Sequence, residues 1–127
     1  MIYGVGTDLV EIARVARALE RFGDRFAERI LCAPELARFR AVGCSAAYLA
    51  KRFAAKEAFG KALGCGVRAP AHWHGLWVST HDLGQPRLEF SSALAARLAT
   101  EGICRTHVSI SDERGLATAT VILECGA

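Results

Sequence analysis

The pattern of apolar and polar positions divides the start of the chain into a short strand and a helix. Residues 2–6 form an apolar run with two glycines, which predicts a buried strand approached closely by a ligand or by another stretch of backbone. Asp8, followed three residues later by Glu11, fits a capping box. We therefore expect the strand to end near Asp8 and a helix to cover residues 9–22.

The rest of the chain continues this alternation of helices and strands. Residues 65–74, which include Pro70, are expected to form a loop. Tight turns at 82–86 and 113–115 imply antiparallel pairing of the strands that they join. The remaining expected elements are helical segments at 25–31, 34–39, 45–63 and 91–100, and strands at 76–80, 87–90, 106–111 and 116–124.

These elements predict a single α+β domain over residues 1–127: a small antiparallel sheet packed with helices, including one long buried central helix at 45–63. Hydrophobic residues make up 52% of the chain and charged residues 23%, a balance that excludes a disordered chain. No apolar run approaches the roughly 20 residues of a membrane span. The five cysteines lack C-x-x-C spacing, so we expect reduced, mostly buried thiols in a cytosolic protein.

The first expected helix carries a basic stripe. Arg14, Arg17 and Arg21 fall on one side, opposite an apolar face of Ile12, Val15, Leu19 and Phe22. The net charge of +3 hints at anionic partners, yet no nucleic-acid recognition motif accompanies it. The stripe is either a solvated helix face or a docking surface for an acidic partner.

Candidate chemistry centres on the long helix. Glu57 and Lys61 are four residues apart and project from the same side, while Arg52 and Lys56 form a second stripe. Asp8, from another segment, joins Glu57 as a candidate pair for a hard cation such as Mg²⁺. The alternatives are a solvated Glu–Lys pair for the helix and a plain helix cap for Asp8.

A second polar set lies on the strand at 106–111. His107, Ser109 and Ser111 point one way, and Val108 and Ile110 the other. This polar face is either functional or simply solvated or hydrogen-bonded internally.

Together these motifs resemble the bacterial holo-acyl-carrier-protein synthase family, which are 4′-phosphopantetheinyl transferases. Their order and spacing fit the family over essentially the whole chain. The matching segments are Gly4-Val5-Gly6-Thr7-Asp8-Leu9-Val10-Glu11-Ile12, Arg52-Phe53-Ala54-Ala55-Lys56-Glu57-Ala58, Lys61-Ala62-Leu63-Gly64, Gly84-x-Pro86 and His107-Val108-Ser109-Ile110-Ser111-Asp112-Glu113.

The resemblance implies a cytoplasmic homotrimer with active sites between subunits, acting in fatty acid biosynthesis. It implies transfer of 4′-phosphopantetheine from coenzyme A to a serine of apo acyl carrier protein, with release of 3′,5′-ADP. Asp8 and Glu57 would hold Mg²⁺ against the pyrophosphate, and Lys61 would contact the attacked phosphate. Glu57 or a water on the metal would take the serine proton.

The same resemblance assigns the two binding surfaces. Coenzyme A binding falls to Arg52, Lys61, Gly84, Pro86 and His107, with His107 supplied by the same or the neighbouring subunit. Carrier-protein binding falls to Arg14, Arg21, Phe22, Arg25 and Phe26. Two other readings remain: a non-catalytic module that binds acidic proteins or nucleotides, and a nucleotide phosphohydrolase that uses the same ion.

Overall fold

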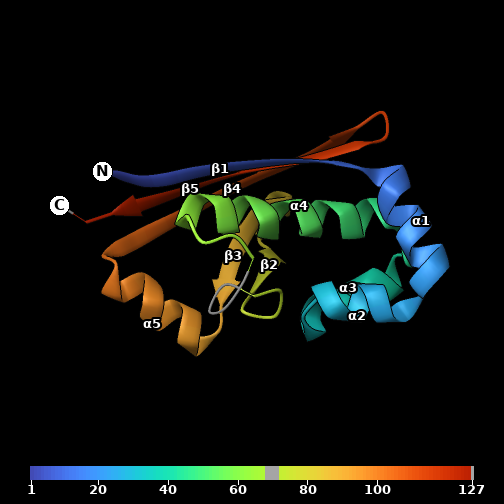
Figure 1. Cartoon of the computed structure of the whole chain (residues 1–127), viewed down its shortest axis with the longest axis horizontal. Coiled ribbons are helices and arrows are strands. Elements are labelled where there is room, and N and C mark those ends of the chain that lie inside the picture. The colour runs from blue at the N-terminus through green and yellow to red at the C-terminus, as the bar shows by residue number, and fades with distance from the viewer. Residues whose placement is uncertain (68–71, 127) are drawn as a thin grey trace.

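A three-stranded antiparallel sheet, in the order β1-β5-β4, forms the long side of the molecule, and helix α4 packs against β1 and β5 (Figure 1). The structure is a computed structural model that describes residues 1–67 and 72–126. Its elements are β1 (Ile2–Glu11), α1 (Ile12–Phe22), α2 (Asp24–Ile30), α3 (Ala33–Ala41), α4 (Ala46–Leu63), β2 (Leu76–Thr80), the 3-10 turn η1 (Asp82–Gly84), β3 (Pro86–Phe90), α5 (Ser92–Thr100), β4 (Ile103–Glu113) and β5 (Leu116–Cys125).

This arrangement confirms the predicted α+β fold with a buried central helix. Helices α1 to α3 gather at one end of the molecule, and α5 lies toward the other (Figure 1). Strands β2 and β3 form a separate antiparallel pair, as the turn at 82–86 predicted. The expected loop at 65–74 includes residues 68–71, which lie outside the described residues. Within the described part, no helix is long and apolar enough to cross a membrane.

The glycines of β1 let the helix lie directly on the strand. A Cβ atom at Gly6 would stand 1.9 Å from the carbonyl oxygen of Ala58, and one at Gly4 would stand 2.0 Å from that of Ala62. The close neighbour is therefore backbone, one of the two possibilities that these glycines indicated. Small residues on both sides bring β1 and α4 into direct backbone contact, which fixes how their functional side chains face one another.

The long helix begins and ends where its local signals indicated. The Ser45 hydroxyl accepts a hydrogen bond from the backbone N–H of Tyr48 at 3.2 Å, and Gly64 ends the helix in the left-handed region at φ 89°. Most of the helix is buried, including Leu49 and Phe59 at 0% exposure. Its burial makes it the core element around which the other segments pack.

The expected helix start at Asp8 is wrong. Strand β1 continues to Glu11, and Asp8 pairs with Ala119 of β5 in the middle of the strand. The helix begins only at Ile12, whose N–H donates to the carbonyl of Gly115 at 2.8 Å. Pairing with a distant strand satisfies the backbone here, so it prevails over the local capping signal.

Phe22, at the end of α1, is 55% exposed, and the centre of its ring lies 5.1 Å from the Arg21 guanidinium carbon. One smaller expectation fails. The cysteines are not mostly buried: Cys44 and Cys104 are exposed, and the other three are half-buried. Arg14, Arg17 and Arg21 are all exposed, as the stripe predicted.

Candidate functional site

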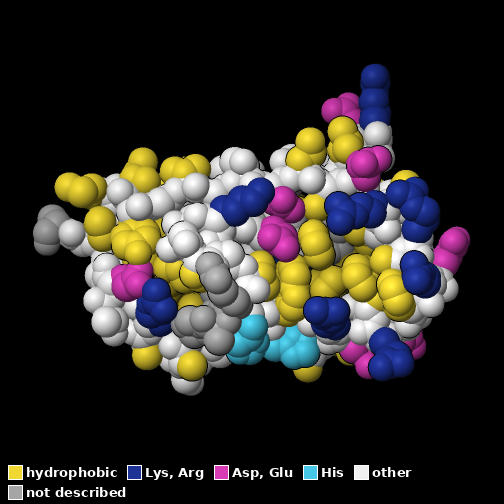
Figure 2. Space-filling model, in the orientation of Figure 1, with side chains coloured by type: hydrophobic (Ala, Val, Ile, Leu, Met, Phe, Trp, Pro, Cys, Tyr) yellow, Lys and Arg dark blue, Asp and Glu magenta, His cyan; other side chains and the backbone are white. Residues whose placement is uncertain are grey.

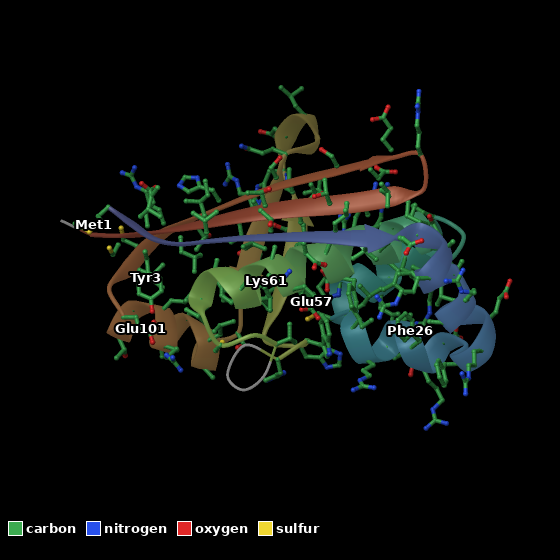
Figure 3. All side chains as sticks on the ribbon, turned by 45° about the horizontal axis from the view of Figure 1, so that its top comes forward. Met1, Tyr3, Phe26, Glu57, Lys61 and Glu101 are labelled. Atoms are coloured by element: carbon green, nitrogen blue, oxygen red, sulfur yellow. The ribbon has the colours of Figure 1, made fainter. Side chains whose placement is uncertain are left out.

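The fold brings Asp8, Glu57 and Lys61 together where β1 crosses α4. The Lys61 ammonium donates to Asp8 Oδ1 at 3.2 Å and to the carbonyl of Thr7 at 2.9 Å. Glu57 lies one helical turn before Lys61 on the same side of α4 (Figure 3). Asp8 belongs to the face of β1 that α4 covers, together with the buried Gly6 and Val10.

The electrostatics of this cluster favour a cation. Partial burial raises the pKa of the Glu57 carboxyl, the nearby charge of Asp8 raises that pKa further, and Lys61 opposes the rise. The Asp8 side chain is 15% exposed, and its Oδ2 atom is buried without a hydrogen-bond partner among the described residues. A buried carboxylate oxygen without a partner, in the same cluster as a second carboxylate, fits a bound cation that would neutralise both.

The cluster offers such a cation few protein ligands. No group of three or more His, Cys, Asp or Glu side chains within residues 1–67 and 72–126 is arranged to hold a metal. Mg²⁺ commonly binds one or two carboxylates and takes its other ligands from water and substrate phosphates. The donor set of Asp8 and Glu57 therefore suits Mg²⁺ with a phosphate substrate, and Lys61, 53% exposed, remains accessible to that phosphate.

A basic groove lies between α1 and α2. It encloses about 590 Å³ and is lined by Arg21, Phe22, Arg25, Phe26 and Arg29. Figure 2 shows apolar surface bordered by Lys and Arg side chains at this end of the molecule. The groove unites four of the five residues that the resemblance assigned to the carrier protein, and it adds Arg29, which extends the same run of basic residues. We call this cavity the carrier groove.

A smaller apolar pocket shares one residue with the carrier groove and is lined by neighbours of Asp8 and Glu57 along β1 and α4. It encloses about 200 Å³ and is lined by Val10, Arg14, Val15, Ala18, Phe26 and Phe53. Phe26 lines both cavities. Val10 follows Asp8 by two residues on the same strand face, and Phe53 precedes Glu57 by one helical turn. In Figure 3, Glu57 correspondingly lies between Lys61 and Phe26.

Arg52 lies elsewhere. It is five residues from Glu57, so it projects about 140° away around α4. Its guanidinium carbon stacks 4.1 Å from the centre of the Tyr48 ring, and its buried Nε atom has no hydrogen-bond partner in the described part of the chain. It lines a cavity of about 370 Å³ that extends to Thr80, the strand partner of Pro86. Arg52 and the turn of Gly84 and Pro86 thus form a second region, apart from Lys61.

His107 lies on the opposite face of the sheet from Asp8. Its strand partner on β5 is Ile122, which pairs with Val5 on β1, and this row points away from α4. The imidazole Nε2 atom lies 2.6 Å from Glu124 Oε2 and is open to solvent. Within one chain, the sheet separates His107 from the acidic pair, so the residues assigned to coenzyme A do not converge on one pocket.

Sequence reasoning missed one buried polar pair. Lys56, grouped with Arg52 on a second stripe of the helix, is fully buried, and its ammonium lies 2.7 Å from Glu35 Oε1. The available signal was the charge itself, because a lysine within a helix that is apolar on most sides needs a buried partner.

The comparisons with known proteins agree with this fold. The profile of the 4′-phosphopantetheinyl transferase superfamily matches residues 4–120. A holo-[acyl-carrier-protein] synthase of Nitrosospira multiformis is 49% identical, over 98% of this chain and 99% of that one. The crystal structure of the synthase from Neisseria meningitidis superposes with a TM-score of 0.94 at 44% identity, covering 98% of this chain and 99% of that one.

A third relative was solved with its ligand. The synthase from Bacillus anthracis, in complex with CoA (3′,5′-ADP), has a TM-score of 0.83 at 33% identity and covers 99% of each chain. Fold and matched profile define a transferase of the phosphopantetheinyl class. The chain belongs to the 4′-phosphopantetheinyl transferase superfamily, so the resemblance found in the sequence is confirmed.

Proposed function

We propose that this chain transfers 4′-phosphopantetheine from coenzyme A to a serine of apo acyl carrier protein and releases 3′,5′-ADP, as a holo-[acyl-carrier-protein] synthase acting in fatty acid biosynthesis in the cytoplasm. The observation that carries the proposal is the buried, unpartnered Oδ2 atom of Asp8 beside Glu57 and Lys61. Relatives of matching length bear that name, and one of them was solved with CoA (3′,5′-ADP).

Asp8 and Glu57 are the residues that would hold Mg²⁺. When bound, the ion would neutralise negative charge on the pyrophosphate oxygens during transfer. Lys61 adds a positive charge at the same place, and its bond to the Thr7 carbonyl keeps its ammonium over β1.

The transfer itself needs an attacking oxygen and a proton acceptor. The serine Oγ forms a bond to the β-phosphorus of coenzyme A, and the bond from that phosphorus to the oxygen of the leaving 3′,5′-ADP breaks. The serine proton passes to the Glu57 carboxylate, whose pKa is raised by partial burial and by the nearby charge of Asp8.

The carrier groove is the docking surface that we propose for the carrier protein. Its three arginines, with Arg14 in the adjoining pocket, present positive charge around two phenylalanines. Acyl carrier proteins are acidic, as the family resemblance implies, so these charges would attract them and the phenylalanines would contribute apolar contact. The groove adjoins the apolar pocket, and the docked serine would therefore approach Glu57 from that side.

We further propose a homotrimer with active sites between subunits. Arg52 and His107 cannot reach the acidic pair of their own chain, whereas a neighbouring subunit could present them to it. The sheet face that carries His107 also exposes apolar side chains, with Val5 53% and Leu9 65% exposed. Such an apolar face fits burial against another copy of the chain. His107 would then complete the coenzyme A site of its neighbour.

Mass spectrometry of an apo carrier protein tests the function. After incubation with this protein, coenzyme A and Mg²⁺, we expect the carrier to gain the mass of one phosphopantetheine group, and chelation of the metal to prevent the gain. A non-catalytic binding module would leave both substrates unchanged. A phosphohydrolase would release 3′,5′-ADP while the carrier kept its original mass.

A further inference from the structure

A fully buried lysine stands next to Glu57 on α4. The Lys56 ammonium donates hydrogen bonds to the carbonyl of Ile30 at 2.7 Å, to Glu35 Oε1 at 2.7 Å and to the carbonyl of Trp73 at 2.8 Å. An ammonium group has three protons, so these three oxygens satisfy it completely. The bonds join α4 to the end of α2, to the first turn of α3 and to the segment before β2.

The partner carboxylate is equally saturated. Glu35 is 1% exposed, its Oε1 atom accepts from the backbone N–H of Cys32 at 3.0 Å, and its Oε2 atom accepts from that of Val78 at 2.9 Å. The Lys56 ammonium, which α4 carries, lies against the C-terminus of α2, where the helix dipole favours a positive charge. Glu35 lies in the first turn of α3, where the helix dipole favours a negative charge. Lys56 and Glu35 form a junction at which five chain segments meet: α2, α3, α4, the segment before β2 and β2 itself.

Stabilising the fold is not a sufficient reason for this junction. Well-packed apolar residues of the same size usually replace a buried ion pair without loss, because desolvation offsets the attraction between the charges. Directional hydrogen bonds instead fix where the joined segments lie. Here they join α2, which carries Phe26 and Arg29 of the carrier groove, to α4, which carries Glu57.

We propose that Lys56, through Glu35, is a positioning residue that holds the carrier groove in register with the Asp8–Glu57 pair. This inference rests on the proposed function. Phe26 lies one helical turn before Ile30, so the bond from Lys56 to the Ile30 carbonyl anchors the same side of α2. Loss of the bond lets α2 shift relative to α4, and the docked serine then misses its place at the site.

The test is Lys56→Met, with Lys51→Met as its matched control. Lys51 lies on the same helix, but its ammonium is 3.3 Å from Asp112 Oδ1, away from the junction. We expect Lys56→Met to lower kcat/KM for the carrier protein by about 100-fold, as for a serine misplaced by about 1 Å. The dissociation constant and stoichiometry for coenzyme A should not change, because Glu35 keeps its bonds to Cys32 and Val78. Lys51→Met should resemble the wild type.

If Lys56→Met does not fold, the double variant Lys56→Met with Glu35→Gln removes the charge left unpaired and serves in its place. The positioning role would be overturned if the variant kept the wild-type kcat/KM for the carrier protein, calculated per coenzyme A-binding site. A parallel loss of coenzyme A stoichiometry and turnover would also overturn it, because that pattern reports a smaller folded fraction. A wild-type protein that binds coenzyme A but never modifies the carrier would instead overturn the proposed function.

Discussion

Adding one methyl group to Gly6 should separate the two elements that build the acidic pair. In Gly6→Ala the new Cβ atom would stand 1.9 Å from the Ala58 carbonyl oxygen, about 1.5 Å short of the 3.4 Å at which ordinary contact begins. The carbonyl oxygen is part of the helix backbone and the Cβ atom is fixed directly to the strand backbone, so no side-chain rotation can relieve the clash. Strand and helix must move apart by about that distance, which stretches the 3.2 Å bond between Lys61 and Asp8.

Two measurable losses follow from this displacement. Overpacking of this kind costs about 1–3 kcal/mol of folding stability, which lowers the Tm by roughly 4–12 °C in a domain of this size. A shift of more than 1 Å between catalytic groups lowers the rate by about 100-fold. Thermal denaturation gives the first quantity, and the rate of 3′,5′-ADP release at saturating coenzyme A and carrier protein, well below the Tm, gives the second.

The matched control is Gly126→Ala. A Cβ atom at Gly126 meets nothing within 4 Å, and this glycine does not have a positive φ. We expect this variant to keep wild-type Tm and turnover. If Gly6→Ala also kept both, α4 and β1 would be free to adjust without disturbing the site, and the link drawn here between their close packing and catalysis would be refuted.

Three further predictions concern charge and assembly. Glu57→Gln should abolish turnover yet raise the Tm of the metal-free protein at neutral pH, because the raised pKa of Glu57 means that the fold favours its protonated form. This stabilisation of the wild type is present below the ordinary pKa of 4.5 and is lost as the pH rises through the pKa in the folded state, so the gain in Tm should vanish in acid. An unchanged Tm at pH 7 would contradict this reasoning. Changing Arg14 and Arg21 together to Glu should raise KM for the carrier protein about tenfold and leave KM for coenzyme A unchanged, and added salt should have the same effect on the wild type. A raised KM for coenzyme A with an unchanged KM for the carrier protein would mean that the two binding surfaces are assigned the wrong way round. Mixed oligomers of Asp8→Asn and His107→Ala subunits should regain turnover that neither variant has alone, and light scattering should give the mass of a trimer; a fully active monomer would exclude shared sites.

Local signals predicted much of the fold. Ser45 and Gly64 placed the ends of α4 within a residue, and the strand at 76–80 was predicted with its observed bounds. These signals work because a cap or a turn satisfies backbone groups only a few residues away. The capping signal at Asp8 failed because a non-local strand pairing satisfied the same groups first.

The site was less accessible to sequence reasoning. Spacing placed Glu57 and Lys61 on one side of α4. Residue chemistry offered Asp8 and Glu57 as a cation pair, but it left a plain helix cap open for Asp8, and only the resemblance favoured the metal role. Glu35 lies 21 residues before Lys56 on another helix, and no periodic pattern links the two. Likewise, alternation predicted that His107 shares a polar strand face, whereas the face of the sheet to which it belongs depends on how β5 pairs with both neighbours.

The pairing of β1 with β5 has a consequence for biosynthesis. The Thr118 hydroxyl donates to the carbonyl of Asp8 across 110 residues of sequence. Strand β1, which carries Asp8, therefore cannot pair with β5 until almost the whole chain has been synthesised. Contacts between such distant segments form late in folding. A nascent chain on the ribosome would therefore hold Glu57 in a helix while Asp8 is still unpaired, and transferase activity should emerge only after release of the finished polypeptide.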